Sequence, residues 1–164
     1  MTKILLLSGF IVSMGLLSDS VALAQETDKG QLNLSMGGFN VSRSDTTAMA
    51  QVEYVFTYEK YGFRPVVGLF ATEDSAAYLY GGVNYEFKIN ERWYFTPSLS
   101  VGYYNQGADF DLDYDVEFYS QFRLDYQLDK NIRIGLAAGH ISNADLGDTN
   151  EGAETAYLNY QVAF

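Results

Sequence analysis

Residues 116–127, VEFYSQFRLDYQ, alternate two kinds of side chain along almost their whole length. One row is mainly apolar or aromatic, and the other is mainly charged or amide: Val116, Phe118, Phe122, Leu124 and Tyr126 against Glu117, Gln121, Arg123, Asp125 and Gln127. Successive side chains of a β-strand point to opposite faces. The segment therefore predicts a strand with one apolar face and one strongly polar face.

Seven other segments repeat this alternation, with apolar rows at residues 32–36, 50–58, 63–71, 77–87, 93–103, 132–138 and 156–164. Fourteen Tyr and eleven Phe with only two Pro favour strands over helices. The chain is therefore predicted to be all-β, with eight strands. Pro65 and Pro97 lie inside two of them, and we expect a bulge or a displaced strand start at each.

The connections between the predicted strands alternate in length. Tight turns at 59–62, 89–92 and 129–131 are interleaved with mostly longer, more acidic loops near 42–47, 72–76, 105–114 and 143–153. Short periplasmic turns and longer outer loops are typical of an eight-stranded antiparallel transmembrane β-barrel of the outer membrane, whose polar rows line the lumen. A soluble barrel such as a lipocalin would place the apolar row inside, and periodicity alone does not separate the two.

Both ends of the chain favour the membrane barrel. Residues 1–24 combine Lys3, an apolar run over residues 4–17 and the small-residue site Ala22-Leu23-Ala24, a pattern typical of a cleaved signal peptide. Residues 25–164 then form a single barrel domain. The alternating apolar row that ends at Phe164 resembles the signal read by the barrel assembly machinery, a predicted partner during biogenesis.

Charge and composition exclude several function classes. A net charge of −11 argues against nucleic-acid binding, which needs a basic surface. Without cysteine there is no disulfide, thiol nucleophile or thiolate metal site. The acidic run at 109–115 is either a solvated loop or a contact with lipopolysaccharide phosphates through divalent cations.

The single histidine, His140, continues the apolar row of residues 132–138, and so does Ser142. Glu154 begins the apolar row of the last strand. If His140 lies opposite Glu154, residue 136 lies opposite 158 and 132 opposite 162. All three side chains then meet on the outer wall, at the extracellular rim by strand counting.

These residue types suit ester hydrolysis. A serine hydroxyl becomes a nucleophile when a nearby histidine takes its proton, and a carboxylate orients the imidazole. Asn150 is a candidate donor to the oxyanion, and Gly152 lets backbone N–H groups approach a substrate. Asn143 shapes the loop or adds a contact.

His140-Ile141-Ser142-Asn143 followed by Asn150-Glu151-Gly152-Ala153-Glu154 resembles the signature of the lipid A 3-O-deacylase (PagL) family. The resemblance implies an eight-stranded outer-membrane barrel without a cofactor. It further implies Ser142 as nucleophile, His140 as base, Glu154 as the third triad member and Asn150 in the oxyanion hole. Its substrate would be lipid A in lipopolysaccharide at the outer leaflet.

Two alternatives remain open at this stage. One is a non-enzymatic structural or adhesive barrel, and the other is a phospholipase or acyltransferase at the same rim. The sequence is compatible with a monomer or a homodimer.

Overall fold

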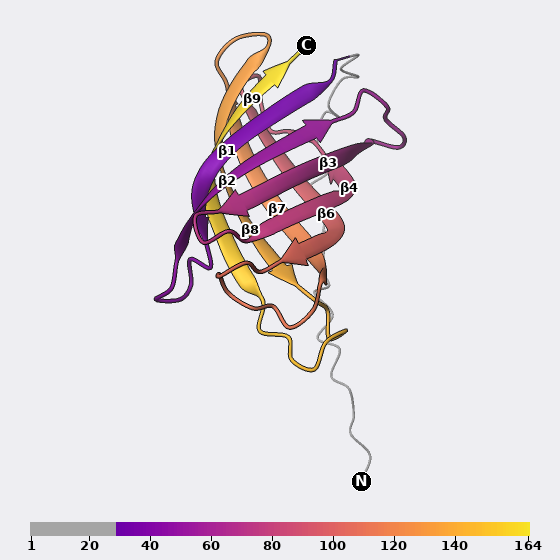
Figure 1. The fold of residues 1–164 in the computed structure, drawn as a ribbon. Helices are drawn as coiled ribbons and strands as arrows, with labels where there is room; N and C mark the ends of the chain where they lie inside the picture. Colours follow the sequence, from indigo (N-terminus) through magenta and orange to yellow (C-terminus); the bar gives the residue numbers. More distant parts are fainter. Residues whose placement is uncertain (1–28) are drawn as a thin grey trace, which may run out of the picture.

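The computed structural model describes residues 29–164, so the predicted signal peptide lies outside the described part. These residues form nine strands: β1 (Gln31–Phe39), β2 (Thr47–Val55), β3 (Phe63–Thr72), β4 (Ala77–Tyr85), β5 (Phe87–Lys88), β6 (Trp93–Asn105), β7 (Val116–Gln127), β8 (Ile132–Ser142) and β9 (Ala153–Ala163). Each pairs antiparallel with its neighbours, β1 also pairs with β9, and β4 with β6, which closes the sheet (Figure 1). The two-residue β5 prolongs β4, so the predicted eight-stranded barrel is confirmed.

The gap between β4 and β5 lies opposite Pro97. The β4–β6 ladder ends at the pair Asn84–Ser98, and the β5–β6 ladder resumes in the same register at Phe87–Phe95. A proline has no N–H to donate to a neighbouring strand. The predicted bulge at Pro97 is therefore wrong. The ladder is interrupted for two residues and continues in the same register.

Pro65 is accommodated in a second way. The β2–β3 ladder ends at the pair Val55–Val66, and the Phe56 N–H still donates to the Pro65 carbonyl at 3.0 Å. The returning bond, from Pro65 to the Phe56 carbonyl, needs an N–H that proline lacks. The Arg64 guanidinium replaces it, since Nε and Nη2 donate to that carbonyl at 3.0 and 2.8 Å. A side chain, and not a bulge, completes the strand end.

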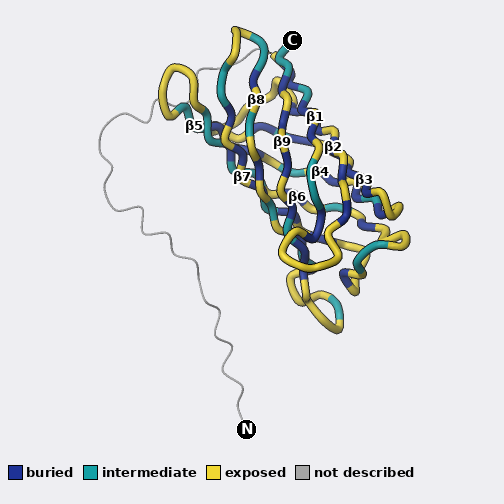
Figure 2. The backbone as a smooth tube through the Cα atoms, turned by 90° about the vertical axis from the view of Figure 1, so that its left-hand side faces the viewer, coloured by how far each residue is buried: buried dark blue, intermediate teal, exposed yellow. Residues whose placement is uncertain are grey.

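The polar rows are buried in the lumen and the apolar rows are exposed on the outside. Buried and exposed residues alternate along the strands (Figure 2). On β7, Arg123 and Asp125 are buried, whereas Phe122 and Leu124 between and beside them are 56% and 40% exposed. A soluble barrel would have the opposite arrangement. The lipocalin-like alternative is therefore wrong, and the exposed wall is suited to lipid.

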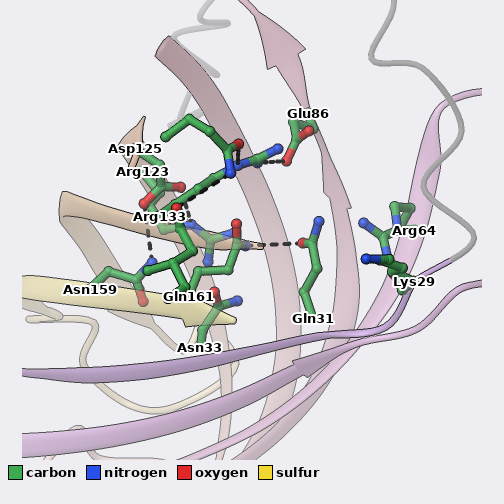
Figure 3. A network of polar contacts seen from close by, with 12 residues as sticks. Lys29, Gln31, Asn33, Arg64, Glu86, Arg123, Asp125, Arg133, Asn159 and Gln161 are labelled. Carbon is green, nitrogen blue, oxygen red and sulfur yellow. Dashed lines mark hydrogen bonds and ion pairs between the residues drawn. The ribbon is translucent and has the colours of Figure 1, made fainter. Parts of the chain in front are cut away.

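The lumen is filled by two different layers. Near the longer loops, aromatic side chains pack together, with Tyr78 stacked on Tyr80 at 5.3 Å between ring centroids. Toward the C-terminus the filling is polar: Arg123 Nη1 lies 3.1 Å from Glu53 Oε1, and Arg123 Nε lies 2.9 Å from Asp125 Oδ2 (Figure 3). The lumen thus contains an aromatic layer near the longer loops and a charged layer near the tight turns.

The connections separate to the two ends of the barrel as predicted. The end that holds the C-terminus carries the tight turns, of which Tyr61-Gly62 is closed by two 3.0 Å bonds between Lys60 and Phe63 (Figure 1). The positive φ angles of Tyr61 and Gly62, 56° and 83°, are those of a type I′ turn. The other end carries residues 40–46, 73–76, 106–115 and 143–152. Within residues 29–164, no helix is long and apolar enough to cross a membrane.

Candidate active site

His140 and Glu154 face each other on the outer wall, near the ends of β8 and β9 that carry the longer loops. Their Cα atoms are register partners, as are those of Leu136 and Leu158 two residues away, so the predicted register is confirmed. Nδ1 of His140 lies 3.4 Å from Oε1 of Glu154, with the two side chains 48% and 43% exposed. The carboxylate thus lies on the Nδ1 side of the imidazole.

Ser142 follows His140 by two residues on β8 and shares its face. It pairs across the sheet with Phe118 of β7 and is half-buried. Among the hydrogen bonds of residues 29–164, none joins the Ser142 hydroxyl to the imidazole. Such bonds commonly tighten only when substrate binds. The structure brings the three predicted residues to one patch of the wall.

Gly152 lies directly against the imidazole. A Cβ added to it would fall 2.6 Å from His140 Cε1 and 3.0 Å from His140 Nε2, and its φ is +63°. Both facts favour glycine, because other residues adopt this φ at a cost and their Cβ would displace the ring. The sequence predicts that Gly152 lets backbone N–H groups approach a substrate. The structure adds a second role, because the missing Cβ leaves room for the His140 imidazole.

Asn143 is buried under the loop that joins β8 to β9. Its Nδ2 donates to the carbonyls of Leu112 and Thr149 at 3.0 and 2.7 Å, and its Oδ1 accepts from the Asp145 N–H at 2.9 Å. All of these bonds organise loops. The arrangement favours the loop-shaping role over direct contact with a substrate.

Asn150 lies in the same loop with its side chain exposed. Its Nδ2 donates to Asp145 Oδ1 at 3.1 Å, and within residues 29–164 no hydrogen bond links it to Ser142. The loop reaches the neighbouring acidic loop through Thr149, whose N–H donates to Asp113 Oδ2 at 2.5 Å. The predicted oxyanion donor is therefore close in sequence to Gly152 but is engaged within its own loop.

One contact of the site was not predicted from the sequence. The Ser42 hydroxyl, from the connection between β1 and β2, donates to Oε2 of Glu154. Ser42 is more than one hundred positions from Glu154 in the chain. Its neighbourhood shows no motif, so only the closure of β1 onto β9 reveals it.

The surroundings of the site differ on its two sides. Toward the loops lies an acidic cleft of about 560 Å³, lined by Asp45, Asp74, Asp109, Asp111, Asp113 and Glu151 among others. No set of three or more His, Cys, Asp or Glu side chains in residues 29–164 is arranged to hold a metal ion. Toward the middle of the wall lies an apolar groove of about 870 Å³ that includes Leu136 and Leu158.

Small side chains lie between that groove and the candidate site. Ala138 and Ala156 pair with each other on β8 and β9, one row below His140 and Glu154 and one row above Leu136 and Leu158. Both alanines face outward and are exposed. The wall between the groove and the imidazole therefore carries only methyl groups on these two strands.

Comparison with known proteins gives one family and several barrels. The model of the lipid A 3-O-deacylase (PagL) family matches residues 31–163. No curated protein sequence matches the chain. The crystal structure of the outer membrane enzyme PagL has a TM-score of 0.62 at 15% identity, over 80% of this chain and 98% of that one.

Two further solved structures share the fold. A de novo designed transmembrane β-barrel has a TM-score of 0.61 at 11% identity, over 85% of this chain and 98% of that one. Neisserial surface protein A has a TM-score of 0.53 at 12% identity, over 83% and 96%. These likenesses agree with the transmembrane barrel derived from the polarity of the two faces.

Proposed function

The chain belongs to the lipid A 3-O-deacylase family of the outer membrane, and on that premise we propose that Ser142, His140 and Glu154 form its catalytic triad. The proposal rests above all on the 3.4 Å approach of His140 Nδ1 to Glu154 Oε1 on the lipid-facing wall. A carboxylate in this position selects the tautomer with a proton on Nδ1. Nε2 is then free to accept a proton from the neighbouring serine.

The reaction proceeds in two halves. Ser142 Oγ attacks the carbonyl of the acyl group at the 3-position of lipid A while His140 Nε2 takes the hydroxyl proton. The imidazolium gives that proton to the departing 3-oxygen, which leaves as a hydroxyl. Water then attacks the acyl-enzyme, His140 takes its proton and returns it to Ser142, and the fatty acid is released.

The developing oxyanion needs donors, and Asn150 is the side chain that we propose for this role. Its amide must turn from Asp145 toward the substrate carbonyl. Removal of one such donor costs a factor of about 10²–10³ in kcat in other acyl-transfer enzymes. The backbone beside Gly152 is a second source of N–H groups, since no Cβ stands in the way.

We place this site at the extracellular rim, with the tight turns in the periplasm. A charged side chain on the lipid face costs about 2–4 kcal/mol at mid-bilayer and about 0–1 kcal/mol near the interface. The rim therefore tolerates His140 and Glu154 beside lipid, and the outer leaflet is where lipid A lies. As part of this proposal, the protein is exported as a precursor with a signal peptide and inserted into the membrane by the barrel assembly machinery.

Mass spectrometry of lipid A from cells that express the protein tests the function. We expect loss of one 3-hydroxyacyl group, abolished in Ser142→Ala and in His140→Ala. Ser120→Ala is the control for a neighbouring hydroxyl: Ser120 on β7 pairs with His140 and faces outward like Ser142, and its hydroxyl donates to the His140 carbonyl at 3.4 Å and not to the imidazole. Unchanged lipid A would favour a structural or adhesive barrel, and a gained acyl chain would favour an acyltransferase.

A further inference from the structure

The connection between β1 and β2, residues 40–46, reaches over the end of β9 to the candidate site. The Val41 N–H donates to the Glu154 carbonyl at 3.0 Å, and the Ser42 hydroxyl donates to Glu154 Oε2. A backbone bond and a side-chain bond thus join two successive loop residues to one glutamate. This double attachment fixes both the main chain and the carboxylate of Glu154.

The two carboxylate oxygens of Glu154 have separate partners. Oε1 faces His140 Nδ1 at 3.4 Å, and Oε2 accepts from Ser42. A glutamate side chain has several rotamers, and a single partner would leave the carboxylate free to rotate about its last torsion. With both oxygens engaged, the carboxylate plane is held toward the imidazole.

The connection of residues 40–46 is held in shape by its own hydrogen bonds. Asn40 is buried with a φ of 59°, and its Nδ2 donates to Asp45 Oδ1 at 3.0 Å. The Thr46 hydroxyl donates to the Arg43 carbonyl at 3.1 Å. Its far side is tied down as well, since Arg43 Nη1 lies 2.8 Å from Glu151 Oε2. The loop therefore presents Ser42 to Glu154 from a fixed position.

We infer that Ser42 is a positioning residue of the esterase site, which acts through Glu154 to orient the His140 imidazole. The inference rests on the proposed function, because Glu154 must be the carboxylate of the triad. Ser42 does not touch the reacting atoms. Its hydroxyl keeps the Glu154 carboxylate aligned, and the carboxylate in turn limits the rotation of the His140 imidazole.

The test uses the full-length protein folded in lipid vesicles that contain lipopolysaccharide. In Ser42→Ala, we expect kcat for fatty-acid release to fall about tenfold, as for loss of a hydrogen bond to a charged group, with KM nearly unchanged. Ser42→Thr keeps the hydroxyl at an exposed position and should restore the rate. Ser44→Ala, two residues along the same connection and also exposed, is the matched control and should match the wild type.

A double-mutant cycle separates positioning from a merely structural role. In a Glu154→Ala background, Ser42→Ala should cause no further loss, because its partner is already gone. An equal loss in both backgrounds, or full activity of Ser42→Ala, would overturn the inference. If the alanine variant does not fold, Ser42→Cys keeps the volume with a weaker donor and should show the same selective fall in kcat.

Labelling of Ser142 by a fluorophosphonate makes failure of this inference distinguishable from failure of the proposed function. The probe reports the activated nucleophile without any lipid substrate. A wild type that labels but releases no fatty acid would contradict the lipid substrate only. A labelling rate that does not change in Ser42→Ala would contradict the role of Ser42 even if the enzyme proves to be a deacylase.

Discussion

Gly152, in the loop between β8 and β9, determines whether the His140 imidazole has room. Gly152→Ala would place a methyl group 2.6 Å from His140 Cε1 and would force alanine to a φ of +63°. The left-handed conformation alone costs about 1–2 kcal/mol. We expect the ring to move away from Ser142 and kcat for lipid hydrolysis to fall about a hundredfold, since small displacements of a reacting group cost that much.

The matched control for this substitution is Gly81→Ala. Gly81 faces outward on β4, and the nearest atom to an added Cβ is the Val66 carbonyl oxygen at 3.8 Å, an ordinary contact. Activity and barrel stability should be unchanged there. Wild-type activity in Gly152→Ala would mean that the imidazole works in another position.

Single residues of the site were predictable where they follow strand periodicity. Parity alone put His140, Ser142 and Glu154 on one face, and the register assumed between the last two strands, with His140 opposite Glu154, is the one that β8 and β9 adopt. Ser42 was not predictable, because its contact depends on how the closed barrel brings a loop of β1 to β9. The bonds of Asn143 to two separate loops were hidden for the same reason.

At the scale of strands, Arg64 and Pro65 act as one unit at the start of β3. We expect Arg64→Met to reduce the free energy of unfolding by about 1–3 kcal/mol, because the Phe56 carbonyl loses the two guanidinium bonds that replace the missing ladder bond. Unfolding by urea in lipid vesicles, followed by tryptophan fluorescence, measures this change.

Pro65→Val supplies the N–H that the ladder lacks and so tests the explanation. In that background Arg64→Met should be less damaging, since the valine can donate to Phe56 in place of the guanidinium. Equal losses in the two backgrounds would mean that Arg64 stabilises the barrel through another contact, such as its 2.9 Å bond to the Lys29 carbonyl.

The small side chains of Ala138 and Ala156, next to the site, lead to a second prediction at the scale of strands. Ala138→Leu should obstruct the approach from the apolar groove to His140 and lower lipid hydrolysis about tenfold, or about 1.4 kcal/mol in the barrier. Labelling of Ser142 by the small fluorophosphonate should be unaffected. Ala71→Leu is the matched control, an exposed outward alanine on β3.

An equal loss of labelling in Ala138→Leu would show that the added side chain disturbs His140 itself and not the approach of the acyl chain. Labelling of Ser142 thus distinguishes hindered entry of the acyl chain from a damaged catalytic residue.

Strand number and orientation followed from the sequence, but strand ends did not. β2 ends at Val55, before the aromatic residues that continued its alternation, because Pro65 cannot extend the ladder on β3. β4 is interrupted for an equivalent reason opposite Pro97. Side-chain periodicity predicts which face a residue joins, whereas the ends depend on the hydrogen bonds of the neighbouring strand.

For the whole molecule, the alternating pattern established that the barrel has a polar interior but not which groups pair within it. Arg123 meets Glu53 from β2, seventy residues away, and Asp125 on its own strand. Asn159 of β9 adds a bond to Asp125 at 3.1 Å (Figure 3). The Arg123–Glu53 contact crosses the lumen and depends on barrel diameter and strand stagger, which the sequence does not display.

The Arg123 network should govern the stability of the barrel without governing its chemistry. Arg123→Met leaves two buried carboxylates without their cation, and breaking a buried ion pair in this way costs about 3–5 kcal/mol. Addition of Glu53→Gln and Asp125→Asn should recover much of the loss, because neutral amides can stay in the lumen without a cation. The free energy of unfolding in vesicles gives both values, and an unchanged value in Arg123→Met would mean that lumen water already solvates the carboxylates. Because Arg123 points inward while His140 points outward, the kcat of the folded variant should equal that of the wild type, which would separate the stability of the barrel from the chemistry on its wall.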